Sequence, residues 1–138
     1  MTEANPQGPS SGLTPHITIG GGKAAQAIDF YTRAFGAVEQ RRMPGPDGIK
    51  IMHAHLILNG ASLMLNDDVP EMRAPGDYTP PAAVTLHLQV ADADATWAKA
   101  LAAGAQVRFA IADQFWGDRY GQVTDPFGFA WSIGSPIT

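Results

Sequence analysis

A repeated order of strands and one helix constrains this chain more than any other feature. Apolar runs separated by turn residues predict strand, helix and three strands in the first half, and the same order again in the second. Each predicted helix ends at a glycine, Gly36 in the first half and Gly104 in the second, about 68 residues apart. A module of this size has one helix and covers only one face of its sheet, so the modules must pair to bury a core.

In the first half the pattern predicts a strand at 13–19, a helix at 24–37 and strands at 38–43, 49–58 and 61–65. Asn59-Gly60 between two apolar runs indicates a hairpin turn. The helix has apolar residues at the spacing of a buried stripe: Ala24, Ala27, Ile28, Tyr31, Ala34 and Phe35.

In the second half we expect a strand at 83–90, a helix at 95–103 and strands at 106–112, 120–124 and 129–133. Asp92 or Asp94 can cap the helix, and Trp97, Ala98 and Leu101 share its expected buried face. The fold class is therefore α+β, with two β-α-β-β-β modules whose mixed sheets form a ligand cleft, within the chain or across a dimer.

The domain prediction follows from the same pattern. Residues 1–12 are rich in Pro, Gly and Ser and are expected to be a disordered tail, or in part a cloning remnant. Residues 13–138 are expected to form one domain, with module one at about 13–67, a linker at about 68–81 and module two at about 82–135.

Composition excludes several classes of partner and chemistry. The net charge of −4 and the lack of a basic stripe argue against nucleic acid. No apolar run approaches the roughly 20 residues that span a bilayer, and the first residues lack a signal-peptide core, so a cytoplasmic location is the default. The chain has no cysteine and therefore no thiol nucleophile or cysteine zinc site.

The segment 114–128 combines aromatic residues, a charge pair and glycines, and ends in the turn Asp125-Pro126-Phe127-Gly128. Arg119 could hold an anionic group by its bidentate fork, while Trp116 and Tyr120 could stack on a ligand. The structural alternatives are a surface pair between Asp118 and Arg119, and a Trp116 that plugs the end of the core.

Strand alternation places the histidines on particular faces. In 49–58 the even positions, from Met52 to Leu58, are nearly all apolar and should face the helix, which leaves His53 and His55 on the other face. By the same argument His16 and Ile17 point to different faces of their sheet, as do His87 and Leu88. All four histidines are therefore expected on the cleft side.

The chain resembles the vicinal oxygen chelate superfamily, which includes glyoxalase I, extradiol dioxygenases, and fosfomycin- and bleomycin-resistance proteins. The run 27–36 is similar to the first helix of the superfamily. The PhnB-like branch is indicated by five shorter matches: His53 in Ile-Met-His-Ala, the run 63–67, the run 115–121, the turn 125–128 and Trp131. The resemblance covers nearly the whole chain from Leu13 onward and implies a homodimer.

The resemblance implies metal-ligand positions at His16 and near Met64, Thr85 and Ser132. Only His16 is of a suitable type for a zinc, nickel, iron or manganese ion, because the usual glutamates are missing. Met52 and Met64 are interpreted as packing residues.

Two hypotheses for the histidines stay open. Some of them bind a metal, with His16 the foremost candidate, or one of His53, His55 and His87 acts as a general acid or base. In the simpler alternative each lines a wet cleft and bonds to a neighbour. Two functions follow: a glyoxalase- or dioxygenase-type enzyme, a lyase or oxidoreductase with an altered metal site, or a metal-free protein that binds a small molecule or drug, as bleomycin-resistance proteins do.

Overall fold

The structure is a computed structural model that describes residues 8–137. The chain divides into two compact units, one of residues 8–29 and 37–78 and one of residues 30–36 and 79–137. Each unit is described below by itself. The division after residue 78 falls within the segment predicted as a linker. The first seven residues of the predicted tail lie outside the described residues.

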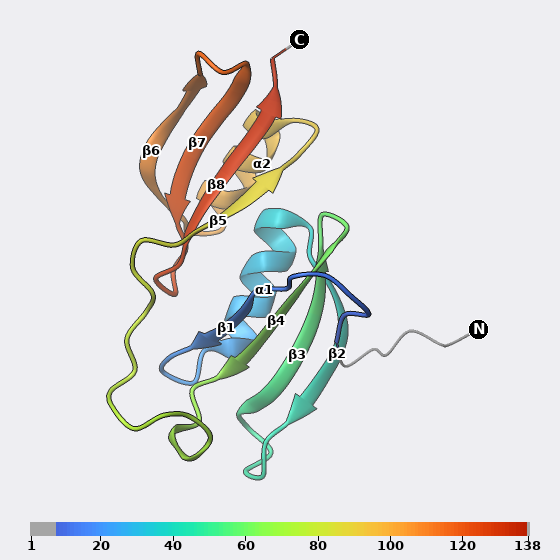
Figure 1. Ribbon diagram of the computed structural model, residues 1–138, viewed down its shortest axis with the longest axis vertical. Coiled ribbons are helices and arrows are strands. Elements are labelled where there is room, and N and C mark those ends of the chain that lie inside the picture. Colours follow the sequence, from blue (N-terminus) through green and yellow to red (C-terminus); the bar gives the residue numbers. More distant parts are fainter. Residues whose placement is uncertain (1–7, 138) are drawn as a thin grey trace, which may run out of the picture. The chain divides into compact units, whose positions relative to one another are not determined.

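The first unit contains one four-stranded mixed sheet (Figure 1). Its elements are β1 (His16–Ile19), the beginning of α1 (Ala24–Phe35), β2 (Val38–Pro44), β3 (Ile51–Leu58), β4 (Ala61–Asp67) and the 3-10 turn η1 (Pro70–Met72). The strand order is β1-β4-β3-β2, with β1 parallel to β4 and the other pairs antiparallel. Asn59 and Gly60 both have positive φ, as the predicted hairpin turn requires.

The second unit repeats this arrangement. It comprises the end of α1, then β5 (Thr85–Gln89), α2 (Ala93–Ala102), β6 (Gln106–Asp113), β7 (Asp118–Thr124) and β8 (Ala130–Pro136). The strand order is β5-β8-β7-β6, and β5 is parallel to β8. The predicted α+β class and the repeated β-α-β-β-β order are therefore confirmed. The predicted cleft between the two sheets stays a prediction.

A buried carboxylate joins three elements of the first unit. Asp67, at the end of β4, is 2% exposed. Its Oδ1 accepts a hydrogen bond from the backbone N–H of Ala24 (2.9 Å), and its Oδ2 accepts one from that of Ile51 (2.7 Å). The first N–H groups of a helix have no partner within the helix, and Asp67 accepts a hydrogen bond from one of them. Its negative charge is also stabilised by the positive end of the helix dipole.

Asp125 is the corresponding buried carboxylate of the second unit. Its Oδ1 accepts from the backbone N–H groups of Phe127 and Phe129, which closes the predicted turn between β7 and β8. Its Oδ2 accepts from the Tyr31 hydroxyl and from Nε1 of Trp131. Tyr31 and Trp131 also pack together, with ring centroids 5.2 Å apart. The segment predicted to be strand, turn and strand is thus held from inside by one carboxylate.

The predicted face of α2 was right for Trp97, which lies over the sheet, and wrong for Ala98 and Leu101. Ala98 and Leu101 are exposed, and the buried residues of the helix are Ala93 and Ala100. Small side chains let the helix approach its sheet closely, and Trp97 lies half-buried over Gly121, where a Cβ would come within 2.6 Å of the indole. Asp92 is the N-cap of α2, as expected, and accepts from the N–H of Ala95.

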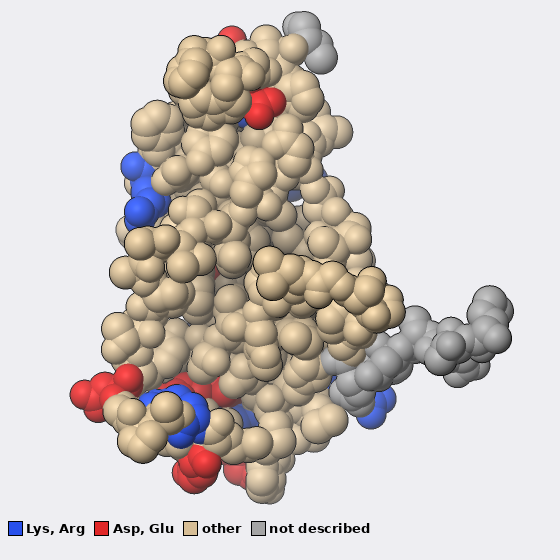
Figure 2. Space-filling model, in the orientation of Figure 1, with Lys and Arg blue, Asp and Glu red and all other residues tan. Residues whose placement is uncertain are grey.

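Charge is sparse over the face drawn in Figure 2. Acidic and basic side chains lie side by side at the lower end of this view, and only a few charged side chains are seen elsewhere on it. Within residues 8–137, no helix is long and apolar enough to cross a membrane.

Candidate functional site

One face of the first sheet gathers three of the four histidines of the chain. The register aligns Arg41 on β2, His55 on β3, Met64 on β4 and His16 on β1 in one row across all four strands. Residues directly opposite on neighbouring strands share a face, so these side chains are neighbours. We call this surface the histidine face.

A second row runs beside the first. Met43 lies opposite His53, and Asn66 lies opposite Thr18. The His16 and His53 rings meet edge to face with centroids 6.0 Å apart. Strand alternation therefore predicted the placement of His16, His53 and His55 correctly.

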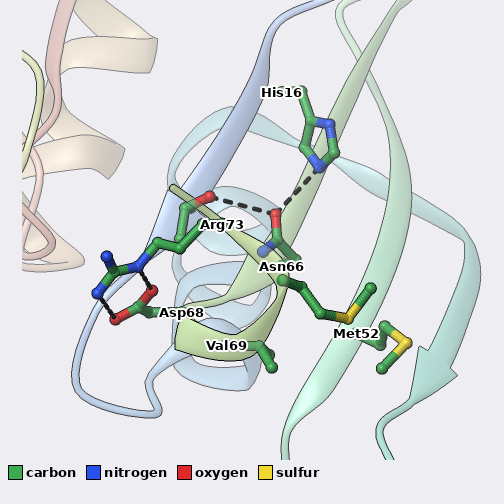
Figure 3. A pocket seen from close by; sticks show the side chains of 8 residues that line it. His16, Met52, Asn66, Asp68, Val69 and Arg73 are labelled. Carbon is green, nitrogen blue, oxygen red and sulfur yellow. Dashed lines mark hydrogen bonds and ion pairs between the residues drawn. The ribbon is translucent and has the colours of Figure 1, made fainter. Parts of the chain in front are cut away.

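The tautomer of His16 follows from its neighbours. Nδ2 of Asn66 donates to the backbone carbonyl of Asp67 (2.7 Å), which fixes the orientation of the amide. Oδ1 of Asn66 therefore faces His16 and accepts from Nε2 at 3.0 Å (Figure 3). Because Nε2 carries the proton, Nδ1 of neutral His16 retains its lone pair.

A pocket of about 310 Å³ opens next to these residues (Figure 3). It is lined by polar and apolar side chains together: His16, Thr18, Met52, Asn66, Asp68, Val69, Met72 and Arg73. Nε of Arg73 donates to Oδ1 of Asp68 at 2.6 Å, and this hydrogen bond lowers the pKa of the Asp68 carboxyl. The two charges on the pocket wall thus neutralise each other.

Strand alternation predicted that the Met52 side chain faces the helix, and this prediction was wrong. Met52 is only half-buried and lines this pocket with His16. The cause is an irregularity in the β2–β3 ladder, where Met43 pairs with His53 but Pro44 pairs with Ile51. Such a slip re-aims the side chains next to it.

His55 is the most enclosed of the predicted catalytic residues. It is 5% exposed, and its Nε2 lies 2.8 Å from the hydroxyl of Ser62. This contact fits the simpler alternative, in which the histidine bonds to a neighbour. His53 is less buried than His55.

The second sheet carries a matching row on one face: Phe109 on β6, Gln122 on β7, Ser132 on β8 and His87 on β5. Nδ1 of His87 lies 2.7 Å from the Ser132 hydroxyl, and Nε2 lies 2.8 Å from Oε1 of Gln89. The Gln89 oxygen can only accept, so Nε2 carries the proton and the Ser132 hydroxyl donates to Nδ1.

Aromatic rings extend this row, and we call the surface the ring face. Tyr120 stacks against His87 with centroids 5.9 Å apart, and Trp116 meets Tyr120 edge to face at 5.3 Å. Phe109 lies 6.4 Å from Tyr120 on another side. Phe109 and Trp116 are each 49% exposed. Trp116 therefore does not plug the core but stands at its surface.

Arg119 does not join Tyr120. Adjacent strand residues point to opposite faces, and Arg119 lies opposite Ser135, whose hydroxyl accepts from the N–H of Ala93 at the start of α2. The guanidinium pairs with Asp94 at 3.2 Å and with Asp113 at 3.3 Å. These hydrogen bonds raise the pKa of Arg119. The predicted substrate-binding residues thus separate into Trp116 and Tyr120 on the ring face and Arg119 on the helix side.

The donor set does not fit the divalent metal ions considered from the sequence. Within residues 8–137, no group of three or more His, Asp or Glu side chains could hold a metal. The row through His16 contains Met64 where the resemblance would place a carboxylate, and Thr85 and Ser132 belong to the second unit. A zinc, nickel, iron or manganese site at His16 therefore stays a prediction without a complete set of ligands.

Several residues of these two faces were not identified from the sequence. Asn66, Phe109 and the Asp68–Arg73 pair were not among the predicted site residues. The run of polar residues Asn66-Asp67-Asp68 at the end of a predicted strand was the sequence signal that could have identified Asn66 and Asp68. Ser132 was considered only as a failed metal ligand, although strand pairing places it against His87.

Comparison with known proteins defines the class. The sequence model of the Glyoxalase/Bleomycin resistance protein/Dioxygenase superfamily matches residues 14–133. The chain belongs to this superfamily.

Three individual proteins illustrate the relationship. An uncharacterised protein of Mycobacterium tuberculosis is 54% identical over 91% of this chain and 74% of its own length. The structure of the Arabidopsis thaliana At5g48480 gene product has a TM-score of 0.71 at 31% identity, covering 89% of this chain and 97% of its own. The PhnB protein of Bacillus cereus has a TM-score of 0.70 at 21% identity, covering 91% and 99%, and thus shares the fold.

Proposed function

We propose that this protein binds a small planar molecule on the ring face of its second sheet, and that binding requires no metal. The observation that carries the proposal is the group of adjacent rings formed by His87, Tyr120, Trp116 and Phe109. Aromatic pairs of this kind contribute roughly 0.5–1.5 kcal/mol beyond the area that they bury, and a planar ligand can extend them.

The exposure of these rings supports the proposal. Trp116 and Phe109 present half of their surface to solvent, on the same side as polar groups of Gln122 and His87. An apolar patch with a few polar groups nearby is the usual composition of a ligand site. Nε2 of Gln122 donates to the Tyr120 hydroxyl at 2.9 Å, which holds the central ring in place.

Gly134 makes room for this arrangement. A Cβ at this position would come within 3.2 Å of both His87 and Gln89. The backbone of β8 is therefore bare where the His87 ring and the Gln89 side chain lie over it. Rigid rings held in this way lose little freedom when a ligand binds.

A thermal-shift screen of uncharged planar heteroaromatic compounds tests the proposal, followed by titration of tryptophan fluorescence with each hit. We expect Trp116→Leu to weaken binding at least about tenfold, because one stacking partner is lost. Trp97→Phe is the matched control, since Trp97 packs over Gly121 on the helix side. Equal affinity in Trp116→Leu and in the parent protein for every hit would refute the proposal.

Proton transfer by His87 is a second candidate function, favoured by one observation. Ser132, His87 and Gln89 form a chain of hydrogen bonds in which the base is oriented by a third group. An enzyme of this kind would lose turnover in His87→Phe, a variant that keeps a ring at this position for ligand binding. The homodimer and the cytoplasmic location stay predictions, and sedimentation velocity would test the first.

A further inference from the structure

A bulge in β6 brings a cation to the edge of the ring face. Val107 pairs with Val123 and Phe109 pairs with Gln122, so Arg108 is an extra residue between two consecutive pairs of the ladder. Bulges of this kind re-aim the side chains that they carry. Nε of Arg108 donates to Oε1 of Gln122 at 3.2 Å. Because Gln122 belongs to the ring face, this hydrogen bond places the guanidinium beside the rings.

The guanidinium of Arg108 has no carboxylate partner within residues 8–137. Its hydrogen bond to the neutral Gln122 amide uses the Nε–H donor, which leaves the donors of both Nη groups for a further acceptor. Arg73 and Arg119, in contrast, are each bonded to carboxylates of the chain. A guanidinium fork matches a carboxylate and binds it by two parallel hydrogen bonds.

Tyr120 supplies a second donor on the same surface. Its hydroxyl oxygen accepts from Nε2 of Gln122 at 2.9 Å, and among the described residues its own proton has no acceptor. The two partners of Gln122 fix the orientation of its amide, since Oε1 faces the guanidinium and Nε2 faces the hydroxyl. Arg108 and Tyr120 thus flank one amide, and each retains a donor for a ligand.

The charges of the ring face favour an anion at the Gln122 end. Asp118 points to the same face of β7, but it lies four residues from Gln122, which is about 13 Å along a strand. Asp94 and Asp113 pair with Arg119 on the helix side. A negatively charged group is therefore attracted to one end of the face and repelled from the other.

We propose that the planar ligand of the ring face carries a carboxylate, which the Arg108 guanidinium and the Tyr120 hydroxyl bind. The ring system of the ligand packs against Phe109 and Trp116, which lie on two sides of Tyr120. The inference rests on the proposed function, which supplies the stacking site, and names aromatic carboxylic acids as the class of ligand. One guanidinium balances one negative charge, so a monoanionic acid fits better than a dianionic phosphate ester.

The test is isothermal titration calorimetry of the full chain with pairs of compounds that share one shape. The pairs are naphthalene-2-carboxylate with its carboxamide and quinoline-6-carboxylate with its carboxamide. We expect each acid to bind at least about fivefold more tightly than its amide, as a charge pair at a partly exposed site allows. The acid should also weaken as sodium chloride is raised, and the amide should not.

Variants assign this difference to Arg108. In Arg108→Gln, which can still donate to Gln122, we expect the acid to fall to the affinity of the amide while the amide binds as before. Lys99→Gln is the matched control, because Lys99 is an exposed cation of the same unit on α2 and should leave both affinities unchanged. Circular dichroism establishes that each variant is folded.

The outcomes separate this inference from the proposed function. Equal affinity of acid and amide in the parent protein, or an acid affinity unchanged in folded Arg108→Gln, would overturn the inference and leave planar binding intact. If neither the acids nor the amides bind, the inference also fails, and the screen of uncharged compounds then decides the proposed function by itself.

Discussion

The hydroxyl of Tyr31 donates a hydrogen bond of 2.6 Å to Oδ2 of Asp125, across 94 residues of sequence. Both side chains are buried, at 0% and 3% exposed. The same carboxylate also accepts from the Trp131 indole and from two backbone N–H groups. The turn that begins the last strand is thus tied to the first helix of the chain by a charged acceptor.

Removing this hydroxyl should destabilise the protein. Tyr31→Phe keeps the ring and its packing but deletes a hydrogen bond to a buried charge, which contributes about 1.5–3 kcal/mol. Urea unfolding measures the loss. Tyr120→Phe is the control, because its hydroxyl bonds only a neutral glutamine and should contribute at most about 1 kcal/mol. Equal loss in both variants would contradict the role of Asp125.

Gly121 should not tolerate a methyl group. A Cβ there would come within 2.6 Å of the Trp97 ring and 2.8 Å of the Cα of Ile111, and backbone cannot move aside cheaply. We expect Gly121→Ala to destabilise by about 1–3 kcal/mol, the usual cost of overpacking. Gly45→Ala, where the nearest atom is 3.4 Å away, should change stability by no more than about 0.5 kcal/mol. Thermal and chemical unfolding of the two variants give the comparison.

The tautomer of His87 should depend on Ser132. In the parent protein Ser132 donates to Nδ1, and Nε2 donates to Gln89. In Ser132→Ala the donor to Nδ1 is lost, so we expect the proton to populate Nδ1 more than before. Nitrogen-15 shifts of the ring measure this, and His16, whose partner Asn66 is retained, serves as the internal reference. An unchanged His87 spectrum would mean that Ser132 does not hold the ring.

Acid should break the Asp68–Arg73 pair at the pocket wall. Its hydrogen bond from Arg73 lowers the pKa of Asp68 below the ordinary value of 3.8. The carboxylate therefore stabilises the folded state above that pH, and the contribution is lost as the pH falls through the lowered pKa. Asp68→Asn should show a smaller loss of stability than the parent between neutral pH and the acid limb. The difference will be small, because a single ion pair near the protein surface contributes little to stability.

Local patterns predicted the fold well. Asn59-Gly60 and Asp125-Pro126-Phe127-Gly128 specify turns by their backbone requirements alone, and the helix stripe from Ala24 to Ala34 follows from a fixed period. Strand alternation placed His16, His53 and His55 on one face correctly, because successive side chains of a regular strand point to alternate faces of the sheet. It was wrong for Met52, where the ladder slips by a residue.

Long-range partners could not be predicted from adjacency. The sequence left a surface pair between Asp118 and Arg119 as one alternative, yet Arg119 bonds Asp94 and Asp113 instead. Neighbouring residues on a strand point in opposite directions, so sequence neighbours are poor candidates for a pair there. The buried face of α2 was predicted only in part: Trp97 packs over Gly121, whereas Ala93 and Ala100 are buried in place of Ala98 and Leu101.

Asp67 and Asp125 are buried carboxylates that hold a helix start and a turn. Neither carboxylate uses an atom of the histidine face or of the ring face. Substitutions at His16, Met64, His87 or Tyr120 can therefore accumulate without loosening the framework that presents them. A superfamily built on this plan can exchange one chemistry for another by substitution at a few positions, while the buried carboxylates keep the turns and the helix start in place.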